Sequence, residues 1–500
     1  MKNLLQNYSP FFIINTTYFF MMKTVKFFAG LLICISVMVL SSCAEGCDDS
    51  ERFSSDVQNA QLSSPEIDKS CFTTVTSASG AELVKFTWPL VKGAGGYYCK
   101  VSSLENPEEP EVLVDTLIDG LTVLFDKAED TNYLCEVTTL GNEKLNNAGA
   151  DAPSVFTYST LVEAIKIPEG NDISEFIGKY ITENKEELDQ KYQEDPNNYK
   201  LAFELEGGKT YTMNDSVDFL GYPAVLRGDK QAHAIVEMGE KAFFSCWRSM
   251  KIQWLNINAA NVTKRGVMTL PATPEPSIKS STGQYIVKGI IFQECEINDV
   301  NKYLTFDNQQ SYFVEDLEFI NCVIKLNQQA ATFYMPKSGY YKFTITNTTI
   351  WSTMQSDQVF LNFGGNAGNK IKDLNDVLYN TGYFKLNNST VYNVSYSKKW
   401  AAWNQYAGRA YNTLDIQNVI FVDCSIKKVL EAMGNGNNSY VYSNNTFWYD
   451  GADVTEPENY SKGVPTLKTD PGFADPANGD FTISGADQLT FRTGDPRWIK

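Results

Sequence analysis

The chain has little histidine and little positive charge. His233 is its one histidine, and 42 Lys and Arg residues are outnumbered by 60 Asp and Glu residues, which gives a formal net charge of −18. This balance argues against a nucleic-acid partner, because phosphate binding requires a basic surface. The sequence also lacks a CxxC pair, so a zinc site built from His and Cys is not expected. We therefore expect neither a resident metal nor a cofactor.

The N-terminus lacks an apolar stretch that is long enough for a comfortable membrane span. Its apolar run covers residues 27–40 and follows Lys23 and Lys26. Cations before a short apolar run are typical of a secretory signal peptide. We predict Met21 or Met22 as the natural start of this signal and interpret the residues before it as a misassigned start.

The signal ends in the sequence "LSSC", whose cysteine is Cys43. This ending resembles a bacterial lipobox, which implies a signal peptide at 1–43 and lipidation of Cys43 after cleavage. An ordinary cleaved signal with a chance cysteine is the alternative. The following stretch "AEGCDDSE" resembles the surface-export signal of Bacteroidota lipoproteins. Together these resemblances imply a lipid anchor in the outer membrane, facing the cell exterior, with a flexible polar tether at 44–64.

Residues 65–160 consist of short alternating stretches such as "ELVKFTWPLV" and "NYLCEVTTL". Such stretches, separated by turn-rich segments, predict a small β-sandwich. Their order resembles a fibronectin type III module, with Trp88 in its second strand and Tyr133 in its sixth. Cys99 and Cys135 would lie on adjacent strands, where a disulfide and two small buried thiols are both compatible with the sequence. The module is either a spacer or a sugar- or protein-binding unit.

A helix is predicted at about 172–190, ahead of a long β region that extends to the C-terminus. Its apolar residues recur at helical spacing. Asp172, with Glu175 three positions later, forms a helix N-terminal cap. We expect this helix to cover the open end of the β region that occupies the rest of 161–500.

One phrase recurs through this β region: apolar-x-apolar-x-polar-small-x-apolar. It appears as "IIFQECEI", "LEFINCVI", "FTITNTTI", "FKLNNSTV", "VIFVDCSI" and "YVYSNNTF". Alternation with period two indicates strands, and self-similarity at this period indicates a solenoid. The phrase therefore predicts a parallel β-helix, in which equivalent residues of successive coils stack about 4.8 Å apart.

Stacking places equivalent residues in files along the helix axis. The small position holds cysteine in three coils, which we expect to share one inward-facing file as small apolar residues: Cys295, Cys322 and Cys424. The polar position holds asparagine in four coils, where the amides can hydrogen-bond to one another along a corner: Asn321, Asn347, Asn388 and Asn444.

The domain as a whole resembles the right-handed pectate-lyase-like β-helix. Its first coils would be "ELEGGKTYTM" and "AVLRGD", and its end "DPGFADPANGDFTI". Because the RGD triplet lies within a coil, we do not expect it to be adhesive. The combination of lipobox, fibronectin-like module and β-helix resembles a group of Bacteroidota surface lipoproteins, many of them encoded with glycan-degrading enzymes. This resemblance implies a polysaccharide ligand and partner proteins of a glycan-utilisation system.

Two wide steps between repeats, 348 to 389 and 389 to 424, predict loops on one face of the solenoid. The loop at 394–412 is rich in aromatic residues, amides and cations. Its candidate ligand-binding residues are Trp400, Trp403, Asn404, Tyr406, Arg409 and Tyr411. Aromatic faces stack on sugar rings, and cations suit uronic acids. The alternative is that Trp400 and Trp403 pack the loop against the helix wall while the cations remain solvated.

Catalysis has a weaker basis in the sequence. A pectate-type lyase needs an Arg or Lys base and a Ca²⁺ ion held by clustered acids. Arg409, Lys398 and Lys399 are the candidate bases, but the sequence has no compact acidic calcium motif, and Ca²⁺ is expected only for a lyase. The "NTD…DD" signature of β-helical hydrolases is also absent. The prediction is therefore a surface-anchored binder of pectin-like acidic polysaccharides. The alternatives are a divergent lyase or glycoside hydrolase, and a structural or adhesive surface protein.

Overall fold

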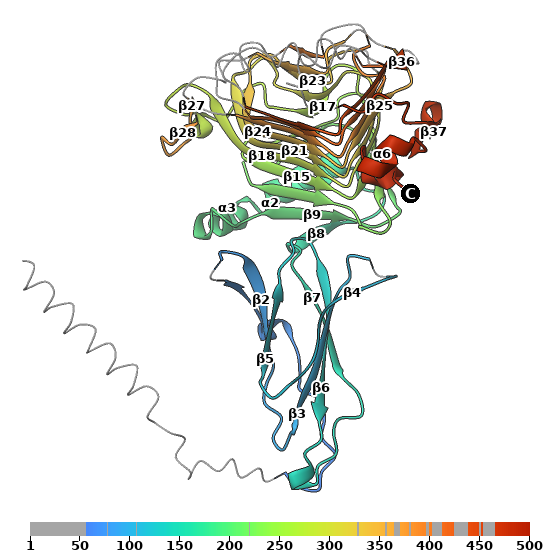
Figure 1. Cartoon of the computed structure of the whole chain (residues 1–500). Helices are drawn as coiled ribbons and strands as arrows, with labels where there is room; N and C mark the ends of the chain where they lie inside the picture. The colour runs from blue at the N-terminus through green and yellow to red at the C-terminus, as the bar shows by residue number, and fades with distance from the viewer. Residues whose placement is uncertain are drawn as a thin grey trace, which may run out of the picture. The chain divides into compact units, whose positions relative to one another are not determined.

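The chain folds into two compact units, one ending at Leu161 and the other beginning at Val162 (Figure 1). The structure is a computed structural model. It describes residues 57–500 except 78, 107, 220, 328–329, 356–357, 365–370, 380–381, 397–399, 403–412, 425–438, 450–451 and 454–465.

The first unit is a β-sandwich of the fibronectin type III kind. One sheet contains three antiparallel strands: β1 (Phe72–Thr76), β2 (Glu82–Thr87) and β5 (Thr122–Asp126). The other contains four antiparallel strands in the order β4 (Glu111–Ile118), β3 (Gly96–Ser103), β6 (Asn132–Leu140) and β7 (Ser154–Ser159). Strict alternation of buried and half-buried residues along β6 shows that one face of this sheet forms the core.

The sandwich core is aromatic and closed. Trp88, directly after β2, and Tyr133 in β6 are both 1% exposed. The Tyr133 hydroxyl accepts a hydrogen bond from the Ala128 backbone N–H at 2.7 Å, which anchors the preceding turn. Cys99 and Cys135 are fully buried free thiols. Of the two alternatives, a disulfide and two buried thiols, the structure therefore has the two buried thiols. Burial raises the pKa of each thiol to about 12.

The second unit has two helices rather than one near its start, after strand β8 (Ala164–Ile167). Helix α2 (Ile173–Glu183) and helix α3 (Lys185–Glu194) meet at Asn184, whose φ of −109° interrupts the helix. The buried residues of α2 are Ile173, Ile177 and Ile181. Their spacing places them on one helical face, which packs into the same apolar cluster as the first coils of the solenoid.

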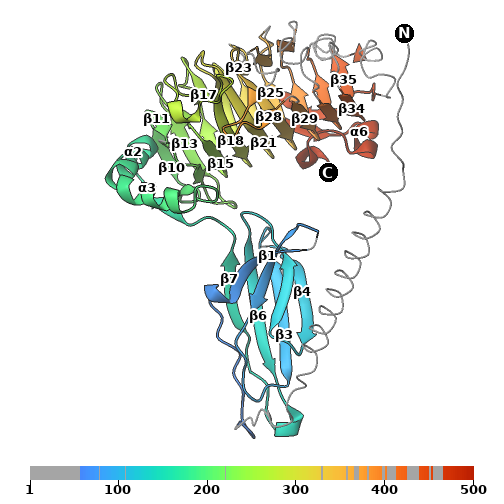
Figure 2. The same ribbon diagram turned by 90° about the vertical axis from the view of Figure 1, so that its left-hand side faces the viewer.

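Three long parallel sheets form the walls of a right-handed β-helix (Figures 1 and 2). The strands of sheet 1, in spatial order, are β8 (Ala164–Ile167), β9 (Leu201–Leu205), β12 (Ala224–Arg227), β15 (Ser249–Gln253), β18 (Tyr285–Gln293), β21 (Tyr312–Ile320), β24 (Gly339–Thr346), β29 (Tyr383–Asn387), β32 (Thr413–Gln417) and β34 (Ser439–Ser443). Because each neighbouring pair is parallel, the chain must complete a full turn between them.

Sheets 2 and 3 complete each turn. The strands of sheet 2 are β10 (Thr210–Met213), β13 (Ala234–Met238), β16 (Leu255–Asn258), β19 (Glu296–Val300), β22 (Val323–Leu326), β25 (Thr349–Ser352), β30 (Thr390–Tyr392), β33 (Ile420–Val422), β35 (Thr446–Tyr449) and the antiparallel β36 (Ala452–Asp453). The strands of sheet 3 are β11 (Ser216–Asp218), β14 (Phe243–Ser245), β17 (Gly266–Thr269), β20 (Tyr303–Phe306), β23 (Phe333–Met335), β26 (Leu361–Phe363) and β31 (Ala401–Ala402).

The corner between sheets 1 and 2 explains the recurring phrase. It holds asparagine with a positive φ at Asn321, Asn347, Asn388, Asn418 and Asn444. Asparagine tolerates this left-handed conformation better than most residues. Within the ladder, Asn418 Nδ2 donates to Asn388 Oδ1 at 3.0 Å, and Asn444 Nδ2 donates to Asn418 Oδ1 at 3.1 Å. For the coil of Asn418, the sequence predicts the phrase at "VIFVDCSI", with Asp423 at the corner. The structure places Asn418 at this corner, so the predicted register of this coil is wrong.

That register error also moves Cys424. Cys295 and Cys322 follow sheet 1 in the expected inward file, but Cys424 follows β33 of sheet 2 and lies at the next corner. The prediction of one file for all three cysteines is therefore wrong. The two corners, before and after sheet 2, are easily confused in the sequence. Each places a polar residue of positive φ before a small or apolar residue, as Asp423 and Cys424 do after sheet 2.

The correct count of coils changes the expected loops. Since consecutive corners in this region lie at Asn388 and Asn418, the second wide step disappears, and β31 falls inside the segment 394–412. The first wide step, 348 to 389, is confirmed as an insertion, because it contains the hairpin of β27 (Ile371–Lys372) and β28 (Leu378–Tyr379). A further insertion, which the steps between repeats did not indicate, contains the 3-10 turn Pro276–Ile278.

Candidate functional site

The structure places Trp400 inside the solenoid. Its side chain is fully buried, and its ring packs against Phe360 at 4.7 Å, Phe421 at 5.9 Å and Phe384 at 6.5 Å between centroids. It cannot stack on a sugar at the surface, so its assignment as a ligand-binding residue is corrected. The alternative, in which Trp400 packs against the helix wall, is confirmed. Trp400 directly precedes strand β31, so its ring lies within the wall of the solenoid.

The other candidate residues of this segment lie outside the described residues: Lys398, Lys399, Trp403, Asn404, Tyr406, Arg409 and Tyr411. The lipidation candidate Cys43 also lies outside them.

The described outer face of sheet 3 carries an aromatic strip, which we define as Phe243, Tyr303, Phe306 and Tyr334. All four side chains are half-buried. Phe306 and Tyr334 are direct neighbours on β20 and β23. The Tyr303 and Tyr334 rings stack at 4.7 Å with 12° between their planes, and the Phe306 ring lies 5.1 Å from Tyr303.

The backbone leaves room for this stack. Gly266, one coil earlier on β17, pairs with Tyr303. A Cβ atom at Gly266 would meet Phe306 Cβ at 3.2 Å and the Met268 carbonyl oxygen at 2.7 Å. A side chain at this position would therefore displace the base of the strip.

Two cations flank the aromatic strip. The Arg265 guanidinium lies over the Phe243 ring at 5.6 Å, and the Lys302 ammonium lies over the Tyr303 ring at 5.5 Å. Arg265 also donates to Asn308 Oδ1 at 3.4 Å. In the part of the chain that the structure describes, neither cation forms an ion pair. Their charges therefore remain available to an anionic group.

Polar groups that could accept or donate to a ligand lie beside the rings. Within the described ranges, no hydrogen-bond partner is present for the hydroxyls of Tyr303 and Tyr334. Asn362 follows Tyr334 on the next strand, β26, and is half-buried. Apolar ring edges, hydroxyls, an amide and two cations match the mixed surface of a charged sugar chain.

The recurring phrase does not reveal this strip, because the phrase covers only the strands next to the asparagine corner. Sheet 3 strands are two to four residues long and carry no common phrase. One signal was present: the half-buried aromatic residues of "YLTF" and "FYM" fall one coil apart. Recognising it requires the coil register, which the strand phrase alone does not supply.

A second polar cluster lies on sheet 1, and we call it the charged bend: Lys288, Glu315, Asp316, Glu318 and Lys342. In β21 the buried residues on either side of Glu315 and Asp316 are three positions apart, so both carboxylates lie on the outer face. Lys288 Nζ lies 2.6 Å from Glu315 Oε1. Lys342 Nζ lies 3.0 Å from Glu318 Oε1 and 3.6 Å from Asp316 Oδ1.

Burial dominates the acid–base properties of the charged bend. Burial raises the pKa of Glu315, although the hydrogen bond from Lys288 opposes it. Burial likewise raises the pKa of Asp316 against the charge of Lys342. The pKa of Tyr379, from hairpin β27–β28, is raised to about 12 by burial and by the Glu315 and Asp373 carboxylates. Burial therefore makes Glu315 a weaker acid than an exposed glutamate.

The described residues contain no group of three or more His, Cys, Asp or Glu side chains placed to hold a metal ion.

The arginine of the RGD triplet is buried and already paired within the fold. Arg227 is 6% exposed at its side chain, pairs with Glu204 at 2.7 Å and donates to the Val162 carbonyl at 2.8 Å. It lies within β12 and offers no guanidinium to a partner.

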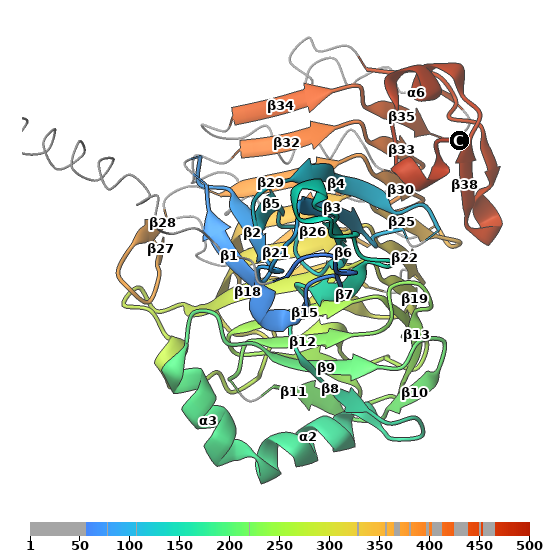
Figure 3. The same ribbon diagram turned by 90° about the horizontal axis from the view of Figure 1, so that it is seen from below.

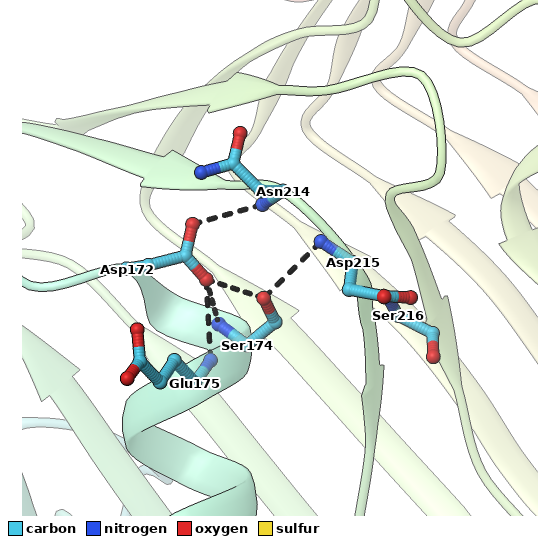
Figure 4. Close-up of a pocket in the computed structure, with 6 residues that line it drawn as sticks. All are labelled: Asp172, Ser174, Glu175, Asn214, Asp215 and Ser216. Carbon is cyan, nitrogen blue, oxygen red and sulfur yellow. Dashed lines mark hydrogen bonds between the residues drawn. The ribbon is translucent and has the colours of Figure 1, made fainter.

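An open pocket of about 300 Å³ lies at the start of helix α2 (Figure 4). Its lining residues are Asp172, Ser174, Glu175, Asn214, Asp215 and Ser216. Asp172 Oδ1 accepts from the backbone N–H groups of Ser174 and Glu175 at 3.0 and 3.1 Å. Its Oδ2 accepts from the Asn214 N–H at 2.9 Å. Because both carboxylate oxygens are used, the pocket is a junction that caps α2 and ties it to the first coil.

Family models match three segments of the chain, and each describes a domain of unknown function. DUF4992 matches residues 17–208, DUF4957 matches residues 209–353 and DUF5123 matches residues 384–498. None of the curated proteins matches the chain.

Among solved structures, the chain is similar to a pectate lyase from Erwinia chrysanthemi in complex with tetragalacturonic acid. The two are 12% identical over 74% of this chain and 88% of that chain, with a TM-score of 0.15. A likeness this weak carries no argument about the site, and the β-helix assignment rests on the strand order. In the described part of the chain, no helix is both long and apolar enough to cross a bilayer.

Proposed function

We propose that this protein binds an acidic polysaccharide along the outer face of sheet 3, through the aromatic strip and its two cations. The observation that carries the proposal is the pairing of half-buried rings with cations, Lys302 over the stacked Tyr303 and Arg265 over Phe243. Neither cation has a carboxylate partner among the described residues. A cation that the fold leaves without a partner favours an anionic ligand.

The geometry suits an extended chain. The strip residues lie on β14, β20 and β23, with β17 between the first two, so the strip follows the helix axis rather than one strand. Successive coils are spaced about 4.8 Å apart, so a polymer lying along the helix axis would meet Tyr334 on β23, then Tyr303 and Phe306 on β20, and Phe243 two coils further on. Uronate carboxylates would pair with Arg265 and Lys302, while sugar C–H groups contact the rings.

The proposal extends to location. The lipobox-like ending at Cys43 and the acidic stretch after it support a lipid anchor on the outer membrane, with the sandwich as a spacer. The test is metabolic labelling with a radioactive fatty acid, in which wild type should be labelled and Cys43→Ser should not. Protease treatment of intact cells then reports exposure. Labelling of Cys43→Ser, or full protection of wild type in intact cells, would contradict this part.

The binding test uses the mature chain from Ala44, without lipid, titrated with polygalacturonate and with a carboxyl-reduced, neutral form of the same polymer. Wild type should bind the acidic polymer more tightly. Tyr303→Ala with Tyr334→Ala should lower affinity at least about 10-fold, because each ring contributes about 1 kcal/mol. Arg265→Gln with Lys302→Gln should lower affinity for the acidic polymer only.

The control is Tyr341→Ala, which removes a tyrosine that is 36% exposed on sheet 1. It should leave binding unchanged. Equal affinity of wild type and the Tyr303 and Tyr334 double variant would remove the strip from the proposal. Absence of binding to either polymer, across a panel of other acidic glycans, would remove polysaccharide binding itself.

A second candidate function, glycoside hydrolysis, is favoured by the charged bend. Glu315, whose pKa is raised by burial, lies beside further carboxylates as a general acid would. The test incubates wild type with a polysaccharide panel and measures new reducing ends and the ultraviolet absorbance of unsaturated uronate. Turnover that is lost in Glu315→Gln would support hydrolysis or elimination at this bend. Turnover that is unaffected by Glu315→Gln would place catalysis elsewhere.

A further inference from the structure

The C-terminal residues 466–500 lie along the outer face of sheet 2, on top of strands far away in sequence (Figure 3). They comprise the hairpin of β37 (Phe473–Asp475) and β38 (Asp480–Ile483), helix α6 (Ala486–Phe491) and the 3-10 turn Pro496–Trp498. Leu467 bridges to Thr446 in the last sheet 2 coil, whereas Arg497 Nη2 donates to the Asn321 carbonyl at 2.9 Å. This segment, the C-terminal strap, therefore runs back across several coils.

The strap covers an apolar surface. The outer face of sheet 2 is apolar under it, with Ile420 and Val422 nearly or fully buried. The Phe481 ring lies 5.7 Å from Trp351 and 5.5 Å from Tyr392. Outward-facing side chains of a parallel β-helix are ordinarily solvated, so these residues stay dry only while the strap is in place.

The strap fits tightly at Gly494, whose φ of +105° is a conformation that favours glycine. A Cβ atom there would meet Ile420 Cδ1 at 2.8 Å and Ile483 Cδ1 at 3.1 Å. The Gly494 N–H donates to the Asn418 carbonyl at 2.8 Å, which ties the strap to the asparagine corner.

Asp495 is the central polar contact of the strap. It is 1% exposed. Its Oδ2 accepts from Thr349 Oγ1 at 2.8 Å, and its Oδ1 accepts from the Arg497 N–H at 3.1 Å. Its own N–H donates to Thr390 Oγ1 at 3.2 Å. Trp498 Nε1 donates to the same Thr349 hydroxyl at 2.8 Å, so one hydroxyl joins two strap residues to sheet 2.

The charges around Asp495 come from the strap and not from sheet 2. Arg497 Nε lies 3.5 Å from Asp495 Oδ1 and has 29% of its side chain exposed. From sheet 2, the described contacts of Asp495 are the Thr349 hydroxyl at its carboxyl and the Thr390 hydroxyl at its backbone N–H, and neither group carries a charge. The cation of the neighbouring coil, Lys325, pairs with Asp299 at 2.9 Å instead.

We infer that residues 466–500 form a pH-sensitive strap, which closes most firmly on sheet 2 when Asp495 is protonated and loosens when Asp495 ionises. An ionised carboxylate at this depth has one partly exposed counter-charge and no solvent. When the strap opens, water hydrates the Asp495 carboxylate. The protonated carboxyl loses no such solvation on closure and can still hydrogen-bond to Thr349.

The pKa of Asp495 agrees with this geometry. Burial raises it from 3.8 to about 6, against the charge of Arg497 and the hydrogen bond from Thr349. Because the closed strap holds the proton more tightly than the open one, closure is strongest below pH 3.8. It weakens as pH rises and levels off above about 6. Each pKa unit corresponds to a tenfold change in the opening equilibrium, so the full range is about 100-fold.

The test is hydrogen–deuterium exchange of the full mature chain, read by mass spectrometry on peptides from 486–500 and corrected for intrinsic exchange. Between about pH 4 and about pH 7.5, opening of the wild-type strap should increase about 50-fold. Asp495→Asn should lose most of this dependence. The matched control Asp480→Asn removes an exposed carboxylate of the same strap and should keep it.

A second variant protects the test against a folding defect in Asp495→Asn. Thr349→Val removes the shared hydroxyl and should increase strap opening at both pH values. The pH dependence should remain or grow, because the hydrogen bond from Thr349 lowers the pKa of Asp495. Two results would overturn the inference: exchange in the strap that does not change with pH in wild type, or the same pH dependence in wild type and Asp495→Asn.

Discussion

Two aromatic groups of the β-helix contrast with each other. The rings around Trp400, which include Phe360 and Phe421, are fully buried between the sheets. Tyr303 and Tyr334 stack just as closely, but on the outer face of sheet 3, half-buried and beside Lys302. Ring spacing does not distinguish the two groups.

The difference shows that a residue's direction relative to the wall, and not local composition, separates a core residue from a ligand contact. Trp400 lies in a segment rich in cations and amides, yet its ring points inward. Tyr334 lies on a strand with the buried neighbours Phe333 and Met335 on either side, yet its ring points outward. Because strand side chains alternate, a shift of one residue exchanges the two roles.

The strongest test of the contrast is Trp400→Ala. Removing a fully buried indole leaves a cavity, so the free energy of unfolding should fall by about 3–5 kcal/mol. Chemical denaturation of the mature chain, followed by far-UV circular dichroism, measures it. Trp400→Phe keeps most of the volume and should lose clearly less. A loss below about 1 kcal/mol for Trp400→Ala would show that the ring is not a core residue.

The asparagine corner should be nearly as sensitive. Asn418→Ala removes two ladder hydrogen bonds and places alanine at a φ of 56°. The expected loss of unfolding free energy is about 2–3 kcal/mol, combining about 1 kcal/mol per hydrogen bond with the left-handed backbone. Asn418→Gly relieves only the backbone part and should lose about 1 kcal/mol less. Equal losses in both variants would mean that the backbone conformation contributes nothing.

A subtler change on the outer face is Tyr334→Phe. It keeps the ring stack and removes a hydroxyl that has no partner among the described residues. If this hydroxyl binds a sugar, affinity for polygalacturonate should fall about 3- to 10-fold. The free energy of unfolding should hardly change. Calorimetric titration measures the affinity, and a thermal melt provides the control; a changed melt with unchanged affinity would assign the hydroxyl to the fold.

The smallest effect concerns the thiols. Burial raises the pKa of Cys99, Cys322 and Cys424 to about 12. Since the thiolate is the reactive form, these residues should remain unmodified by iodoacetamide near pH 8 in the native chain. Cys71, which is half-buried, serves as the internal comparison and should be modified first. Peptide mapping reads each position, and labelling of Cys322 before Cys71 would indicate that the walls open readily.

Much of the second unit could be predicted from local patterns. The capping role of Asp172 and the corner positions of Asn321 and Asn347 follow from chemistry that acts within a few residues, namely helix capping and left-handed backbone. The register of the coil that contains Asn418 could not be predicted, because Asp423 and Cys424 at the next corner imitate the same phrase.

The candidate site was harder to predict than the fold. The neighbours of the strip residue Tyr303 and of the strap residue Asp495 depend on which coils lie side by side. Insertions make the sequence spacing between coils irregular, so these neighbours cannot be read from the sequence. The contact between Asp495 and Thr349 joins residues 146 positions apart, and no periodicity in the chain encodes it.

The sequence by itself determined the kind of fold: alternating strands and asparagine corners demand a stacked β-helix, because each requirement is met locally in every coil. Only the tertiary structure decided which rings face the solvent and which lie inside, and what covers the outer face of sheet 2. Those outcomes depend on the register between coils. Register is set by the summed packing of the whole stack and not by any one segment.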